Sequence, residues 1–189
     1  AIQCEVLRTE IFAGRQQPLI FGEPPPWMAW LLESLRLMAE AQYDRAVSLR
    51  DQAFELAEES SGTIDEQPFK WIADADSRLG PVLEIIVNGR YYWAPIQQIR
   101  EMKVSPAEDL RDLVWLPAQF TWVNGGEAVG LIPTRYPGSE NAQDSAVQLA
   151  RTTQWKELAE GVYQGLGVRM LTTDLDDYPV LNIREVEIS

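Results

Sequence analysis

The sequence of 189 residues contains no histidine, and this absence excludes more chemistry than any other feature of the composition. Hydrolases of the triad type need an imidazole base, and the commonest zinc sites need an imidazole ligand. Both classes are therefore excluded. Catalysis by carboxylates alone stays possible, and we predict neither a bound cofactor nor a bound metal.

Cysteine occurs once, at Cys4, so the chain cannot form an internal disulfide. A single thiol is compatible with a reducing compartment, and we interpret it as a small buried hydrophobe rather than a nucleophile. No apolar run approaches the roughly 20 residues that cross a bilayer, and the start lacks a signal-peptide pattern. The chain begins Ala1-Ile2-Gln3 without an initiator Met, so we expect that the native N-terminus has been removed. These features predict a cytoplasmic protein.

Basic residues are scarce: 16 Lys and Arg stand against 29 Asp and Glu, which gives a formal net charge of -13. Such a surface repels phosphate backbones, and the basic residues are scattered singly rather than gathered in a stripe. We therefore predict no nucleic-acid partner. Binding to anionic membrane surfaces is disfavoured for the same reason.

The first third of the chain has helical patterns. Residues 1–13 predict the end of a helix, which Gly14 stops. Apolar residues then recur at helical spacing in two segments: Trp27, Leu31, Leu35 and Met38 in the first, and Ala46, Leu49, Ala53 and Leu56 in the second. Two helices joined this tightly form a helical hairpin. The spacing of Tyr43, Ala46 and Ala53 is typical of the second helix of a tetratricopeptide repeat.

The pattern changes near residue 80 to short β-branched segments. Val82–Val87 and Arg90–Trp93 flank Asn88-Gly89, the preferred pair for a type I′ hairpin turn. Further strands are expected at 114–123, 127–133, 167–172 and 180–188, and a helical segment at 144–151. We predict an α+β fold with a tetratricopeptide-like helical hairpin region over residues 1–62. A mostly antiparallel β-rich domain, a sheet or partly closed barrel, follows over residues 63–189.

Acidic and glycine-rich segments offer few catalytic candidates. Asp74 and Asp76 could bind a hard cation, but no regular set of oxygen donors follows them, so capping or a salt bridge to Arg78 is preferred. A second acidic cluster is interpreted as a solvated loop; it comprises Asp174, Asp176 and Asp177. The glycines at 161, 165 and 167 lack the order and the Lys-Ser/Thr pair of a phosphate-binding loop.

Aromatic residues and one arginine are the candidates for binding another protein. Trp, Tyr and Arg are enriched at interface hot spots, and seven Trp is a high number for this length. The candidate partner-binding residues are Tyr91, Trp93, Trp115, Trp122, Arg135 and Tyr136. Three tryptophans lie on predicted strands, and for them a large core cluster is preferred to a groove that accepts a helix; they are Trp93, Trp115 and Trp122.

Three segments resemble the signature blocks of the ImpE/TagJ family of type VI secretion accessory proteins. They are Asn88–Pro95, Asp109–Ala118 and Leu131–Glu140, and Leu181–Glu187 is similar to the C-terminal strand of the family. The resemblance implies a cytoplasmic accessory of a contractile injection machine with a longer tetratricopeptide-type N-terminal region. It also implies binding to the N-terminal helix of the sheath subunit TssB and, in some systems, association with the ATPase ClpV. No catalytic residues are attributed to the family.

These observations predict a non-enzymatic adaptor that holds an amphipathic helix in an aromatic-lined groove near Tyr91, Trp93, Trp115 and Arg135. Two alternatives stay open. The chain could be a structural spacer, with binding confined to missing N-terminal repeats. It could also be a carboxylate-based hydrolase or metal-dependent enzyme that uses Asp74 and Asp76, which predicts close, buried carboxylates with raised pKa values.

Overall fold

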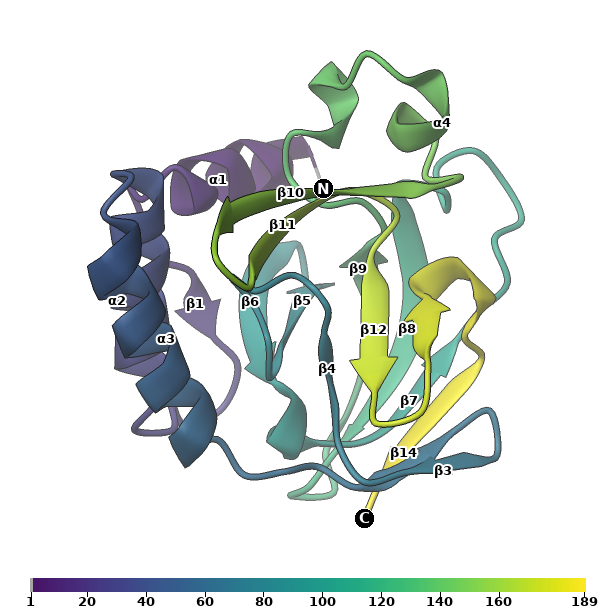
Figure 1. The fold of residues 1–189 in the computed structure, drawn as a ribbon. Coiled ribbons are helices and arrows are strands. Elements are labelled where there is room, and N and C mark those ends of the chain that lie inside the picture. The colour runs from purple at the N-terminus through teal and green to yellow at the C-terminus, as the bar shows by residue number, and fades with distance from the viewer. Residues whose placement is uncertain (1) are drawn as a thin grey trace.

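The computed structural model describes residues 2–189 and combines helices on one side with a large, mostly antiparallel sheet (Figure 1). This arrangement agrees with the predicted α+β class. Within residues 2–189, no helix has the length and apolar character that a membrane span requires.

Three helices form the N-terminal part: α1 (Ile2–Phe12), α2 (Met28–Ala39) and α3 (Tyr43–Leu56). The predicted apolar stripe of α2, from Trp27 to Met38, is buried as expected. α3 contributes Ala46 and Ala53, both fully buried, and these small side chains let α2 and α3 approach closely. The helical hairpin is therefore confirmed, while its tetratricopeptide character stays a prediction. Leu56 was expected on the buried stripe but is 53% exposed, because the helix ends there beside a surface cleft.

The main sheet has nine strands among the described residues, in the order β1-β6-β5-β9-β8-β7-β14-β2-β3. Its strands are β1 (Leu19–Ile20), β2 (Gly62–Ile64), β3 (Gln67–Phe69), β5 (Val82–Val87), β6 (Arg90–Pro95), β7 (Ile99–Val104), β8 (Trp115–Trp122), β9 (Glu127–Pro133) and β14 (Glu185–Ile188). β1 pairs with β6 in parallel, and the other pairs are antiparallel.

The hairpin between β5 and β6 is confirmed with its turn. Asn88 and Gly89 have φ angles of 50° and 74°, the positive values that a type I′ turn requires at both central positions. β8 and β9 also match the predicted strands closely, and Gly125 adopts φ 84° in the turn between them. Local turn chemistry therefore specified both hairpins.

Two smaller sheets complete the fold, and the sequence predicted them poorly. They are β13-β12-β4, with β4 (Ile72–Asp74), β12 (Met170–Thr173) and β13 (Asp177–Pro179), and the ribbon of β10 (Thr153–Ala159) and β11 (Val162–Gly167). The predicted strand at 167–172 is wrong in its bounds, because it spans the break between β11 and β12. Short helical segments are α4 (Ser145–Gln148), η1 (Ile96–Gln98), η2 (Ser139–Asn141) and η3 (Val180–Asn182).

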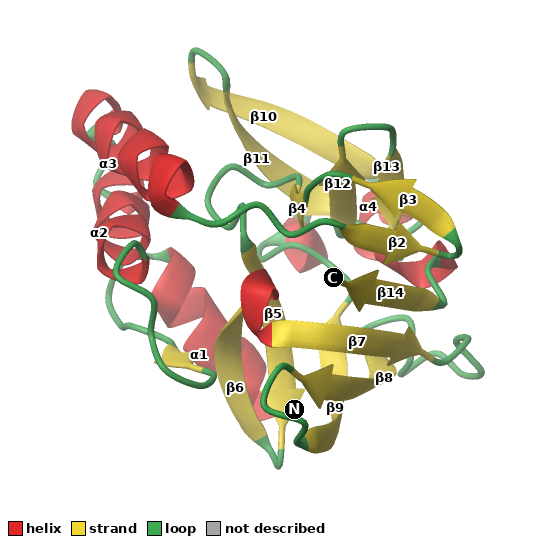
Figure 2. Cartoon of the chain, turned by 90° about the horizontal axis from the view of Figure 1, so that it is seen from below, coloured by secondary structure: helices red, strands yellow, loops and turns green. Residues whose placement is uncertain are grey.

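Two large apolar cores hold these layers together, and a third, small cluster joins α2 and α3 to β11 through Leu37, Ala46 and Val162. One lies between the curved main sheet and the sheet of β4 and β12 (Figure 2), and it contains Ile72 and Leu171 together with Leu83 and Ile85. The other joins the helices to the back of the sheet, and includes Trp93 among its members. The helical part thus packs directly on the β-rich part, and the division at residues 62 and 63 stays a prediction.

Candidate functional site

A network of buried charges lies between α1, the main sheet and the loops beside β4. Six charged residues of this network are at most 6% exposed: Arg8, Asp74, Asp76, Arg78, Glu84 and Arg169. Burying a charge is costly unless it is paired and hydrogen-bonded. The three arginines and three acids balance in formal charge, so the contacts of each group decide what the network can do.

Glu84 is the centre of the network. Its carboxylate accepts from Arg8 Nε at 2.5 Å and Nη2 at 2.9 Å, and from Arg169 Nη2. Burial alone would raise the pKa of Glu84, but the two guanidinium groups outweigh burial and lower this pKa to about 2. Tyr91 adds a hydrogen bond from its hydroxyl at 2.5 Å. Glu84 is therefore a fixed anion that anchors two arginines.

Asp74 continues the network toward the surface. Its Oδ2 accepts from Arg169 Nη1 at 2.5 Å, and its Oδ1 accepts from the Tyr136 hydroxyl and the Asp76 N–H, each at 2.8 Å. Burial raises the pKa of Asp74 to about 6, because the single arginine does not fully offset the loss of solvent.

Asp76 and Arg78 form the predicted salt bridge, with Nε and Nη2 donating at 2.9 and 2.7 Å. Asp76 also accepts from the Gly165 N–H at 2.9 Å, and Arg78 lies 4.8 Å from the ring centroid of Phe12 in α1. The prediction is confirmed for Asp76. Asp74 instead pairs with Arg169, a partner 95 residues away that local sequence does not indicate.

The carboxylate enzyme hypothesis is met only in part by this arrangement. Asp74 and Asp76 are close and buried, and the pKa of Asp74 is raised. However, each of their four side-chain oxygens accepts at least one hydrogen bond from the protein. A general acid or base must reach a substrate proton, and these oxygens point to internal donors. The network therefore joins α1 to β5 and β4 through buried ion pairs.

Four of the six predicted partner-binding side chains lie inside the protein, which corrects the expected position of the groove. Exposure is 1% for Tyr91, 0% for Trp93, 6% for Trp122 and 1% for Tyr136. They are buried because their polar atoms have internal partners or their rings stack: Trp93 Nε1 donates to the Tyr91 hydroxyl at 2.8 Å. Trp122 stacks on Phe21 with 4.0 Å between ring centroids.

The other two predicted residues are half-buried and also held internally. Trp115 Nε1 donates to Glu5 in α1 at 2.8 Å. Arg135 Nη1 donates to the Gln148 carbonyl at 2.7 Å, and the Arg135 carbonyl accepts from Arg8. Trp122 and Trp93 belong to two different core clusters, and Trp115 packs against the cluster of Trp93, so the three rings do not build one shared cluster. The six side chains also do not form an exposed groove in which a partner could dock.

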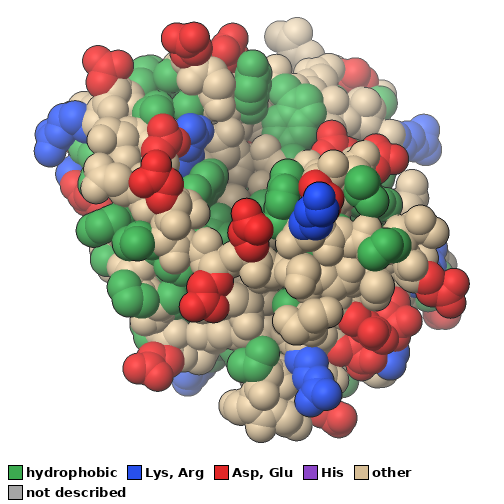
Figure 3. Space-filling view, turned by 60° about the horizontal axis from the view of Figure 1, so that its bottom comes forward, with side chains coloured by type: hydrophobic (Ala, Val, Ile, Leu, Met, Phe, Trp, Pro, Cys, Tyr) green, Lys and Arg blue, Asp and Glu red, His purple; other side chains and the backbone are tan. Residues whose placement is uncertain are grey.

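A cleft of about 390 Å³ offers such a place, between the end of α3 and the edge strand β4. Its lining residues are Phe54, Ala57, Glu58, Glu59, Ser60, Trp71, Ile72, Ala73, Asp74, Ala75, Asp76, Ser77, Gly80, Pro81 and Thr172. Figure 3 shows the surface hollowed between the helices and the strands, with hydrophobic, acidic and a few basic side chains around it.

Gly80 shapes the floor of this cleft. It has φ +56°, and a Cβ at this position would lie 2.3 Å from Cζ of the Phe54 ring. Only glycine accepts both the backbone conformation and the aromatic ring against it. Sequence reasoning missed the cleft because Phe54, Trp71 and Pro81 come from separate segments.

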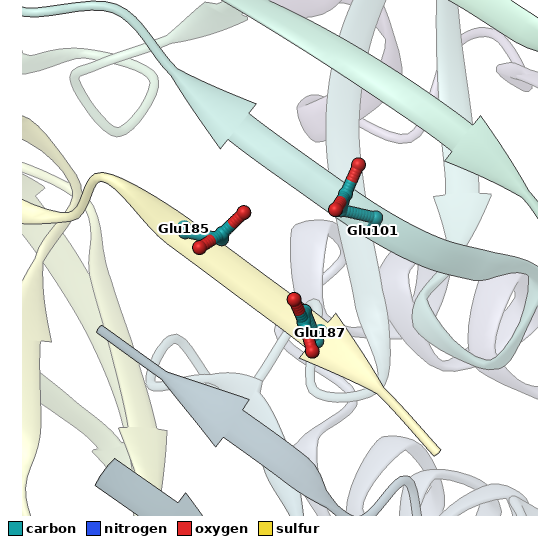
Figure 4. Close-up of side chains that lie close together, drawn as sticks. All are labelled: Glu101, Glu185 and Glu187. Carbon is teal, nitrogen blue, oxygen red and sulfur yellow. The ribbon is translucent and has the colours of Figure 1, made fainter. Parts of the chain in front are cut away.

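A separate acidic group lies on the outer face of the main sheet, where Glu101 of β7 meets Glu185 and Glu187 of β14 (Figure 4). Their carboxylate oxygens come within 4.8 Å of one another. Lys103 supplies a cation here, 2.8 Å from Glu101 and 3.3 Å from Glu185. The group is explained by this surface ion pairing. The predicted solvated loop at Asp174–Asp177 is exposed as expected.

The glycines 161, 165 and 167 belong to the β10–β11 ribbon and its turn rather than to a phosphate-binding loop. A Cβ at Gly165 would lie 2.4 Å from the Tyr136 ring, and Gly167 adopts φ +103°. Gly165 thus allows the close approach of the ribbon to Tyr136, whose hydroxyl donates to Asp74 of the buried network.

Comparison with known proteins agrees with the resemblance in the sequence. The family described as "ImpE protein" matches residues 66–187. The type VI secretion system accessory component TagJ of Pseudomonas aeruginosa is 48% identical over 187 residues, which are 99% of this chain and 65% of TagJ. The chain therefore spans just under two thirds of the length of this relative.

A solved structure has the same fold. The crystal structure of protein VPA1032 from Vibrio parahaemolyticus matches with a TM-score of 0.86 and 24% identity, over 98% of this chain and 70% of that protein. At this identity the likeness concerns the fold alone.

Proposed function

Because this chain belongs to the ImpE family, we propose that it is a non-enzymatic, cytoplasmic adaptor of the bacterial type VI secretion system. In this proposal it binds the N-terminal helix of the sheath subunit TssB and brings the sheath to the ATPase ClpV. The name of the Pseudomonas relative supports the accessory role. The finer partners follow from the family resemblance.

The observation that carries the proposal is the cleft beside α3. Its floor is apolar, with Phe54, Trp71 and Pro81 among the lining residues, and its rim carries Glu58 and Glu59. An amphipathic helix docks its apolar face in such a groove, while acidic rim residues attract basic side chains and speed the encounter.

The binding test is isothermal titration of this chain with a synthetic peptide of the TssB N-terminal helix, beside a peptide of the same composition in scrambled order. We expect saturable binding of the first peptide only. A negative heat-capacity change of binding is also expected, because apolar area becomes buried. Equal heats from the two peptides would contradict the proposal and favour the spacer alternative.

The ClpV part needs its own test. ClpV should be retained on immobilised chain, and retention should increase when the TssB peptide is also present if the adaptor joins the two. Equal retention of ClpV by a resin without the chain would remove ClpV from the proposal.

A carboxylate enzyme is the second candidate, because the pKa of Asp74 is raised and this residue borders the cleft. It is less well supported, since Arg169, Tyr136 and the Asp76 N–H occupy both of its oxygens. Asp74→Asn would abolish any turnover in the enzyme case and leave peptide binding in the adaptor case.

A further inference from the structure

All charged residues in the lining of the cleft are acidic. Its charged lining residues are Glu58, Glu59, Asp74 and Asp76, with neither Lys nor Arg among the lining residues. Asp74 and Asp76 are paired with Arg169 and Arg78. Glu58 and Glu59 are exposed, and within residues 2–189 they make neither an ion pair nor a side-chain hydrogen bond. The rim of the cleft therefore carries uncompensated negative charge.

The C-terminal end of α3 adds to this charge. The last turn of α3 holds no basic residue, and its C-cap Ala57 donates only to the Ala53 carbonyl. The last four carbonyls of a helix have no partner within it, and the aligned peptide dipoles place about half a negative charge there. The nearby Arg50 lies over the Phe54 ring, 5.6 Å from its centroid, and its charge is paired with Asp51. The end of α3 and the acidic rim of the cleft therefore both attract positively charged groups.

We infer that the cleft binds the N-terminal end of a cationic amphipathic helix. The helix points its first turn at the end of α3, places an apolar anchor beside Phe54 and Trp71, and presents basic side chains to Glu58 and Glu59. This inference rests on the proposed function and adds the direction and the charge pattern of the bound helix. The first four N–H groups of a helix are free donors with a partial positive charge, which complement the carbonyls of α3. The reverse orientation would set two negative helix ends against each other.

The test uses two helical peptides with one composition, with the basic residues in the first turn or in the last turn. Each carries a paramagnetic tag at either end and is added to isotope-labelled protein. We expect tighter binding of the first peptide, and broadening of the Ala57 and Trp71 amide signals by its N-terminal tag. Glu58→Gln with Glu59→Gln should weaken its binding by roughly two- to tenfold at low salt. Glu127→Gln, an exposed acid on β9, is the matched control.

Three results would overturn the inference, and they differ from failure of the proposed function. Broadening of the same signals by the C-terminal tag would reverse the direction. Equal affinity of the protein for the two peptides would contradict the proposed charge pattern of the bound helix. Equal affinity of the double variant and the control for the first peptide would contradict it too. Binding of the TssB peptide without any change at Ala57 and Trp71 would place the site elsewhere while the adaptor function stands. Absence of binding by any peptide would remove both proposals.

Discussion

Arg8 and Glu84 form a bidentate ion pair that joins α1 to β5 across 76 residues of sequence. Both side chains are buried, and Glu84 also holds Arg169, which reaches Asp74 at the wall of the cleft. One chain of contacts thus connects the N-terminal helix to the proposed binding surface. Its members also position the aromatic residues Tyr91 and Tyr136, which explains why these side chains face inward.

Removal of Arg8 should destabilise the protein strongly. Arg8→Ala leaves Glu84 buried with one partner fewer, and breaking a buried pair from one side costs about 3–5 kcal/mol of unfolding free energy. Urea denaturation measures this cost. Arg15→Ala is the control, because Arg15 pairs with Glu10 in α1 on the surface, and its effect should be far smaller. Equal shifts of the two midpoints would contradict the structural role of the network.

Stability should depend on pH in two opposite ways. The folded pKa of Asp74 is raised to about 6 from 3.8, so the folded state takes up this proton first and stability rises as the pH falls from 7 toward 4. The folded pKa of Glu84 is lowered to about 2 from 4.5, so the stability from its ion pairs is lost as the pH falls from 4.5 toward 2. Each proton contributes at most about 1.4 kcal/mol per pH unit.

Urea denaturation at intervals between pH 7 and pH 3 checks this profile. In Asp74→Asn, the rise in unfolding free energy between pH 7 and pH 4 should become smaller. The loss of unfolding free energy at lower pH should remain. A rise of unchanged size in this variant would assign the effect to another group.

The fold followed from sequence where local chemistry decides it. Asn88-Gly89 fixed the β5–β6 hairpin, and the apolar period of residues 27–38 fixed α2. Arg8 shows where this reasoning fails. It lies among polar residues of a short helix, a position typical of a solvent-exposed side chain. Arg8 is nevertheless only 3% exposed, because it pairs with a buried carboxylate 76 residues away in the sequence.

The candidate site depended even more on distant contacts. Trp93 and Tyr136 were candidates for a partner-binding surface because their residue types favour interfaces, beside the alternative that they pack inside; both are buried, because burial follows from their neighbours rather than from residue type. The pairing of Asp76 with Arg78 was predictable, since the two residues are only two positions apart. The cleft was not, because α3, the segment after it and β4 converge only in the folded chain.

Gly80→Ala should reshape the cleft. The new Cβ would meet Cζ of Phe54 at 2.3 Å, and alanine is strained at φ +56°. We expect a loss of about 1–3 kcal/mol in unfolding free energy and weaker binding of the helical peptide, because the Phe54 ring must move. Gly161→Ala is the control, since it shares a positive φ of 71° but has no atom within 4 Å of the added Cβ. Equal peptide affinity in both variants would show that Phe54 is not part of the binding surface.

The acidic group on β7 and β14 should not require a metal. Lys103 already pairs with Glu101 and Glu185 and occupies the place a cation would take, so chelator or added Ca²⁺ should leave the melting temperature of the protein unchanged. In Lys103→Met the carboxylates lose this cation, and Ca²⁺ should then raise the melting temperature by replacing it. Lys156→Met, on the β10–β11 ribbon, controls for loss of a surface charge. Stabilisation of the unaltered protein by Ca²⁺ would instead indicate a metal site.

Trp71→Ala and Trp93→Ala should separate binding from folding. Trp71 is half-buried in the lining of the cleft. Its truncation should weaken binding of the helical peptide at least tenfold, as is typical of an aromatic anchor, and should change the stability of the protein only modestly. Trp93 is fully buried, and its truncation should cost about 3–5 kcal/mol of unfolding free energy. The fraction of Trp93→Ala that stays folded should bind the peptide with unchanged affinity, because Trp93 is not among the residues that line the cleft. Titration calorimetry with circular dichroism on the same samples measures both quantities. Loss of affinity in the folded Trp93→Ala protein, with retention in Trp71→Ala, would return the binding surface to the aromatic core predicted from the sequence.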